Sequence, residues 1–105
     1  MLNQIVLVGR LVKDPVIEEM EHTKYCRITI AVPRSYKNEN GEYDTDFIPI
    51  TLWNGIAQNT VDYLKKEDLV GIKGRVKSIK MASGYSIEIV AEKLTFLSSK
   101  KTDEE

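Results

Sequence analysis

The sequence predicts an all-β fold: a small, strongly curved barrel of five antiparallel strands with a single helix. Three observations predict it. Several segments alternate apolar and polar residues with the two-residue period of a β-strand, whereas only one segment repeats apolar residues at helical spacing. With 105 residues, 42% of them hydrophobic, the chain has room for one domain with a modest core.

The first two strands are predicted from the apolar runs in the N-terminal third. Gln4 to Leu11 is a β-rich run interrupted by Gly9, and a glycine inside a strand usually marks a bulge or a close backbone approach. The KDP stretch at positions 13 to 15 supplies a turn. The next strand, Tyr25 to Val32, has one buried face. That face comprises Cys26, Ile28, Ile30 and Val32, and it alternates with Tyr25, Arg27, Thr29 and Ala31.

The third strand is the return arm of a hairpin. A long polar connection, PRSYKNENGEYDTD, contains the turn signal Asn40-Gly41 and leads into DFIPITLW, residues 46 to 53. Strand alternation places Ile48, Ile50 and Leu52 on one face of this segment. Phe47 and Trp53 fall on the opposite face, so the largest rings lie away from the predicted core.

One helix and two further strands complete the predicted barrel. Asn54 is the expected N-cap of the helix, whose apolar positions are Ile56, Ala57, Thr60, Val61 and Leu64. Leu69 to Ile79 and Tyr85 to Leu97 form the last hairpin, with Gly84 in its turn. The helix therefore falls between the third and fourth strands, which is the element order of a five-stranded OB-fold, a Greek-key barrel.

The composition offers little for catalysis or metal binding. Cys26 and His22 are the only residues of their kinds, so neither an intrachain disulfide nor a multi-cysteine metal site is expected, and no nucleophile-base pair can be assembled. We expect no enzymatic activity, no metal and no cofactor. The sequence shows neither a secretory signal nor a membrane-length apolar stretch, and it predicts a soluble, cytoplasmic protein.

The charge distribution favours a binding function. The formal net charge is −1, yet residues 72 to 101 carry seven basic and two acidic side chains. Lys73, Arg75 and Lys77 share one strand face, and together with exposed rings they would suit single-stranded nucleic acid, which offers unpaired bases and regular negative charge. The basic stripe alone is equally typical of a solvated strand face. On pattern alone, Phe47 and Trp53 could equally form a subunit interface or a second small core.

The whole chain resembles bacterial-type single-stranded DNA-binding proteins (SSB). MLNQIVLVGRLVKDPV is similar to the N-terminal strand and turn of that family, and DFIPITLWNGIAQNTVDYLKKEDLVGIKGRVKS to the stretch from its third to its fourth strand. The resemblance covers roughly residues 1 to 97. The residues in the family's register are Asn3, Gly9, Asp14, Pro15, Phe47, Trp53, Ala57, Tyr63, Leu64, Lys65, Gly74 and Arg75.

The resemblance implies an OB-fold that binds single-stranded DNA without strong sequence preference in replication, recombination or repair. It also implies a homotetramer, associated with the nucleoid. The family's base-stacking aromatics fall on Tyr36, Phe47 and Trp53, and a fourth aromatic position is occupied here by Met81, which lacks a π-face. Ile79 replaces a position that is often basic. The remaining expected phosphate contacts are Lys73, Arg75, Lys77 and Lys80, with Arg34 and Lys37 near the hairpin loop.

The C-terminus departs from the family pattern. We expect the domain to end near residue 98, followed by a short polar, acidic tail at residues 99 to 105. The final KKTDEE lacks the acidic-hydrophobic tip with which replicative members recruit other proteins, so tip-mediated recruitment is not expected. Two alternative functions stay open on the sequence: an adaptor for replication or recombination proteins with weak nucleic-acid binding, and RNA binding.

Overall fold

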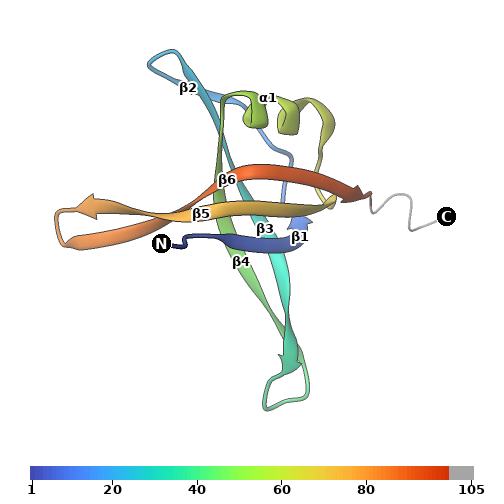
Figure 1. Ribbon diagram of the computed structural model, residues 1–105. Helices are drawn as coiled ribbons and strands as arrows, with labels where there is room; N and C mark the ends of the chain where they lie inside the picture. The colour runs from blue at the N-terminus through green and yellow to red at the C-terminus, as the bar shows by residue number, and fades with distance from the viewer. Residues whose placement is uncertain (100–105) are drawn as a thin grey trace.

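The computed structural model describes residues 1–99, which form one curved barrel with two long projecting hairpins (Figure 1). The six strands and one helix follow the order β1 (Ile5–Leu11), β2 (Glu18–Met20), β3 (Thr23–Lys37), β4 (Tyr43–Trp53), α1 (Asn54–Tyr63), β5 (Leu69–Met81) and β6 (Gly84–Ser98). Within these residues, no helix is long and apolar enough to cross a membrane.

The predicted barrel and the place of its helix are confirmed. The strand order is β1-β5-β6-β4-β3-β2, and the sheet closes because β1 pairs with β3 as well as with β5. The five long strands are β1, β3, β4, β5 and β6, so α1 lies between the third and the fourth. The three-residue β2 is an unpredicted addition that pairs with the start of β3. One pairing differs from the predicted antiparallel barrel, because Thr51 of β4 and Val90 of β6 pair in parallel.

The core is the interior face of the barrel, and it is made by the alternation predicted from the sequence. Cys26 is fully buried among aliphatic side chains, and burial raises the pKa of its thiol, which therefore stays neutral and packs as a small hydrophobic group. Val32 and Ile48 pack against the core from partly buried positions. The buried residues of the cluster are Leu11, Cys26, Ile28, Ile30, Ile50, Leu52, Ala57, Leu64, Val70, Ile72 and Ala91.

The predicted long polar connection between β3 and β4 is wrong. Most of it is strand: the antiparallel ladder continues out to the pair Lys37 and Tyr43, and the turn occupies only residues 38 to 42. The side-chain oxygen of Asn38 accepts hydrogen bonds from the backbone N–H groups of Asn40 and Glu42, and Gly41 adopts a φ of 79°. This ribbon projects from the barrel, so its strands are polar because both faces meet solvent.

The predicted cap of α1 is also wrong. Asn54 is the first residue of the helix, the cap position belongs to Trp53, and no side chain caps the helix N-terminus. Asn54 instead takes a left-handed conformation with a φ of 51°, which asparagine tolerates better than most residues. The sharp exit from β4 therefore depends on Asn54 as a turn residue.

Two glycines allow neighbouring strands to approach closely. A Cβ atom at Gly9 would lie 2.6 Å from the carbonyl oxygen of Ala31, as expected for a glycine in a strand. A Cβ atom at Gly74 would collide with the carbonyl oxygen of Val90, at a point where the β5–β6 register shifts. Both glycines are thus needed where the barrel bends.

We expect Gly74→Ala to lower the free energy of unfolding by about 1–3 kcal/mol, because the methyl group must displace the backbone of β6. Chemical denaturation at fixed protein concentration measures this. Gly55→Ala is the matched control: a Cβ there meets nothing within 4 Å, and alanine in a helix stabilises it by up to about 1 kcal/mol. Equal stability of the two variants would contradict the close-approach assignment.

Candidate nucleic-acid interface

The exterior face of the β3–β4 ribbon carries a row of rings and polar groups. The register pairs Trp53 with Tyr25 and Phe47 with Ala31, so these residues share the face opposite the core. The ring centroids of Tyr25 and Trp53 are 5.4 Å apart with a tilt of 41°, and the guanidinium of Arg27 lies 5.7 Å from the Tyr25 centroid. The Phe47 side chain is 64% exposed and lies outside the core. We name the face bearing Tyr25, Arg27, Phe47, Thr51 and Trp53 the aromatic face.

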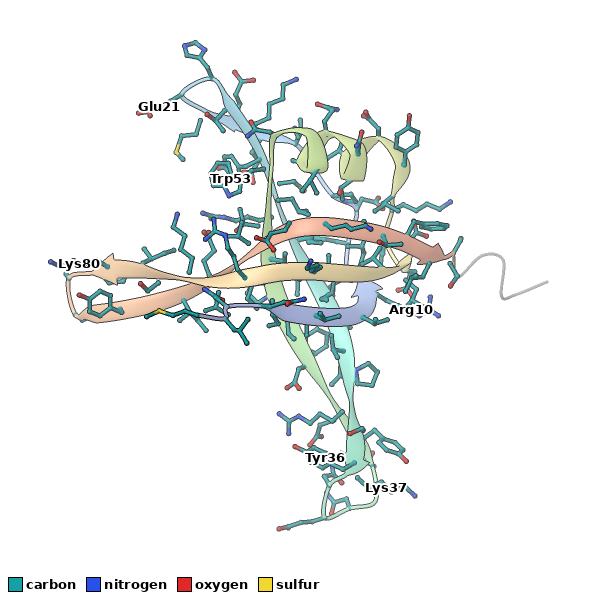
Figure 2. The ribbon with its side chains drawn as sticks, viewed as in Figure 1. Arg10, Glu21, Tyr36, Lys37, Trp53 and Lys80 are labelled. Atoms are coloured by element: carbon teal, nitrogen blue, oxygen red, sulfur yellow. The ribbon has the colours of Figure 1, made fainter. Side chains whose placement is uncertain are left out.

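The predicted stacking residues are spread along this ribbon and do not converge. Trp53 lies at the barrel end, while Tyr36 and Lys37 lie near the far tip of the hairpin (Figure 2). Lys37 follows Tyr25, the partner of Trp53, by twelve positions, which is about 40 Å of extended strand. The Lys37 ammonium is 5.9 Å from the centroid of the Tyr43 ring. The arrangement suits an extended ligand that contacts the ribbon along its length.

Arg34 is engaged by carboxylates. Its Nε and Nη2 donate to the two oxygens of Asp46 at 3.2 and 2.9 Å, and Asp44 lies 3.8 Å away. The hydrogen bond from Arg34 lowers the pKa of the Asp46 carboxyl, and the same contact raises the pKa of the guanidinium. Because Asp46 pairs with Val32, the ion pair between Arg34 and Asp46 lies on the face opposite Phe47. Of the predicted phosphate contacts, Arg34 therefore has its charge most fully offset.

The basic stripe lies on β5, in the second ribbon, which is the β5–β6 hairpin. Lys73, Arg75 and Lys77 are all exposed. Arg75 lies 3.9 Å from Glu92, whereas Lys77 stands opposite Glu88 in the β5–β6 register. Lys80, near the tip of this hairpin, is out of phase with Lys77 and opposite Tyr85, so alternation directs it to the other face (Figure 2).

Met81 and Ile79 lie at the outer end of the same hairpin. Met81 is 52% exposed and pairs with Gly84, beside the turn. Ile79 lines a groove of about 250 Å³ between the two ribbons, facing Pro49 and Thr51 of β4. Met81 occupies the position where the family has a fourth aromatic residue. It is accessible there, and it carries a flexible thioether in place of a ring.

The sequence did not identify several side chains that complete this surface. The register places Tyr43 on the same face as Phe47, and it brings Tyr25 and Arg27 beside Trp53. Thr51 and Glu88 meet across the two ribbons through a hydrogen bond of 3.0 Å. The alternation of Tyr25 and Arg27 with core residues was visible in the sequence, but their partners depend on register, which periodicity does not supply.

The site carries no arrangement for metal chemistry among the described residues. Within residues 1–99, no three His, Cys, Asp or Glu side chains gather closely enough to hold a metal ion. His22 is exposed in the turn between β2 and β3, at a φ of 69°, and Cys26 is buried. The exposed groups on the two ribbons are suited to stacking, hydrogen bonding and charge pairing.

A closed five-stranded barrel with one helix and an exposed aromatic, basic exterior defines an OB-fold of the nucleic-acid-binding type. The model of the single-strand binding protein family matches residues 2–97, and the chain belongs to that family.

Named relatives match along nearly the whole chain. Single-stranded DNA-binding protein 1 of Clostridium acetobutylicum is 43% identical over 107 residues, covering 95% of this chain and 97% of the relative. Single-stranded DNA-binding protein B of Bacillus subtilis is 38% identical over 109 residues, covering 95% and 94%. A crystal structure of a deletion mutant of the Thermus aquaticus single-stranded DNA binding protein superposes with a TM-score of 0.78 at 20% identity. The match covers 92% of this chain and 51% of that one, and it supports the fold.

Proposed function

We propose that the protein binds single-stranded DNA with little sequence preference and protects it during replication, recombination or repair, at the nucleoid and without catalysis. The observation that carries the proposal is the aromatic face, where Phe47 is exposed and Trp53 is half-buried beside Tyr25, on a strand whose other side builds the core. The names of the relatives that match nearly end to end agree with it.

Stacking is the proposed main source of affinity. Every base has a π-face, so rings on an exposed sheet bind unpaired bases without reading their sequence. Tyr25 holds Trp53 at a tilted contact of 5.4 Å, which restricts the indole before DNA arrives and reduces the entropy lost on binding. Phe47 and Tyr43 extend the platform along the ribbon, whereas Tyr36 adjoins Lys37, the register partner of Tyr43, and alternation directs its ring to the opposite face near the tip. Met81 gives the outer end of the β5–β6 hairpin a packing contact without a ring.

The phosphate backbone is proposed to follow basic side chains on both ribbons. Lys77 and Lys73 enter no ion pair within residues 1–99, so their charge is available to phosphates. Arg75 is held loosely by Glu92, and Lys80 and Lys37 lie toward the two hairpin tips. Arg34 must exchange Asp46 for a phosphate before it contributes.

We further propose that the chain assembles as a homotetramer. Val6 and Val8 support this, because they are 67% and 49% exposed on the exterior of β1, which pairs with β3 only at Arg10 and Leu11. The first half of β1 therefore presents an apolar surface and an open strand edge, both of which favour pairing with another copy.

The short acidic tail proposed at residues 99–105 falls, apart from Ser99, outside the described residues.

Phe47→Ala and Trp53→Ala are each expected to weaken binding of a labelled oligo-dT by about 1–3 kcal/mol per lost stacking contact, as measured by fluorescence anisotropy. Oligo-dT should also quench the intrinsic fluorescence of Trp53, the only tryptophan. Tyr63→Ala is the control, since this ring is exposed on α1 away from the aromatic face. If Phe47→Ala dissociated the oligomer and left affinity intact, Phe47 would be an interface residue.

Lys77→Met is expected to reduce the slope of log Kobs against log salt concentration by about one, because one phosphate contact and its counterion release are lost. Arg34→Met serves as a matched cation control and should change the slope by clearly less, since Asp46 already offsets that charge. Equal losses from the two variants would show that DNA displaces Asp46, and an unchanged slope for Lys77→Met would remove Lys77 from the phosphate path.

The oligomer proposal predicts that light scattering coupled to size exclusion gives the mass of four chains, and that Val6→Glu lowers it. A buried, unpaired carboxylate at an apolar contact is costly, so the assembly should dissociate. Val16→Glu introduces the same charge at another exposed valine, outside β1, and should leave the mass unchanged. A monomer in the unmodified protein would reject the proposal.

A further inference from the structure

The two ribbons enclose a groove where β4 passes β6. Its volume is about 250 Å³, below the range of sites for drug-sized molecules, and it suits a single flat ring. Apolar surface comes from Pro49, Ile79 and Ile87, and polar groups come from Arg27, Thr51 and Glu88. The groove opens beside the aromatic face, because Arg27 and Thr51 are register partners on that face.

Glu88 is an unexpected residue to find beside a path for a polyanion. It is half-buried, and the Thr51 hydroxyl donates a hydrogen bond of 3.0 Å to its Oε2. Among residues 1–99, Glu88 takes part in no ion pair, and Oε1 accepts no hydrogen bond. The carboxylate is therefore oriented by one oxygen while the other is left as a free acceptor.

The chemistry of an ionised carboxylate restricts what can occupy this groove. It accepts hydrogen bonds and donates none, and it repels a phosphate. The exocyclic amino group of cytosine donates to such an acceptor, whereas thymine presents a carbonyl oxygen at the equivalent position. Arg27 supplies donors to the same groove, and cytosine also carries a ring nitrogen and a carbonyl oxygen that accept. Cytosine thus matches both polar walls, whereas thymine can offer the carboxylate only its N3–H, which is flanked by two carbonyl oxygens that repel the carboxylate.

We propose that this groove is a base-selective subsite in which Glu88 accepts a hydrogen bond from the exocyclic amino group of an unpaired base, favouring cytosine over thymine, with Thr51 as the positioning residue of the carboxylate. The inference rests on the proposed binding of single-stranded DNA. It adds a limited preference to a surface whose stacking contacts are indifferent to sequence. Unpaired bases in a single strand expose the edge that such a contact needs.

The test compares oligo-dC and oligo-dT of equal length at pH 8, where cytosine is unprotonated, and measures the ratio of their dissociation constants for each variant. Comparing ratios removes the general difference between the two homopolymers. Glu88→Gln should shift the ratio toward oligo-dT by roughly fivefold or more, the low end for one base-edge contact. Thr51→Val should shift it in the same direction, because the carboxylate loses its orienting donor while the net charge is unchanged.

Asp62→Asn, on α1, is the charge-matched control and should leave the ratio at the unmodified value. The same ratio in the unmodified protein, Glu88→Gln and Thr51→Val would overturn the subsite, as would an equal gain in affinity for both oligonucleotides with Glu88→Gln, which would mean that the carboxylate acts only through its charge. Absence of binding to either oligonucleotide by the unmodified protein would instead reject the proposed function. Thermal unfolding of each variant verifies that it is folded.

Discussion

The parallel contact between Thr51 of β4 and Val90 of β6 is the constraint on which the arrangement of this protein depends. The other pairings of the barrel join antiparallel neighbours, and this one brings the two long hairpins together at their bases. On its other side, Val90 lies against β5 where the β5–β6 register shifts at Gly74, and any side chain at Gly74 would strike the carbonyl oxygen of Val90. The hydrogen bond between Thr51 and Glu88 and the groove between the ribbons both follow from the parallel contact.

Closure of the barrel also decides which residues can serve function. Once one face of each strand fills the interior, the alternate residues must point outward, and on β4 these are the rings, Pro49 and Thr51, of which Thr51 is buried beside Glu88 of β6. The same rule turns Lys73, Arg75 and Lys77 outward on β5. Core and surface are thus coupled through one-residue alternation, so a slip in register would exchange them along the whole ribbon.

The sequence was sufficient for the fold class because strand alternation and helical spacing are local signals. The period of Ile48, Ile50 and Leu52 alone predicts the wall of the barrel. Gly9 inside a strand predicts a bulge or a close backbone approach, and the structure has the close approach. The sequence underestimates the length of the β3–β4 hairpin because its outer strands are solvated on both faces, and their polar composition resembles that of a loop. The sequence does not distinguish Asn54 as a turn residue from Asn54 as an N-cap, because asparagine is favoured at both positions.

The composition of the candidate site could be only partly predicted, for a physical reason. Phe47, Trp53 and Lys77 stand out because large rings and repeated cations on an outward face are unusual within one strand. Tyr25, Arg27 and Glu88 acquire their roles from partners that lie far away in the sequence, and those partners are set by register and closure. The pairing of Arg34 with Asp46 shows the reverse effect, since a cation that looked available is offset by a neighbouring strand.

The near-neutral net charge of the chain is consistent with binding that depends more on stacking than on charge. A surface that held a polyanion mainly by charge would carry a large excess of cations, yet Arg34 and Arg75 are each matched by carboxylates and the net charge is −1. Under the proposed function, stacking would then supply most of the affinity, and Lys77 and Lys73 would guide the path of the DNA backbone. A carboxylate such as Glu88 is tolerable on such a surface because Lys77 stands opposite it in the β5–β6 register and because the base proposed for the groove carries a donor on its edge.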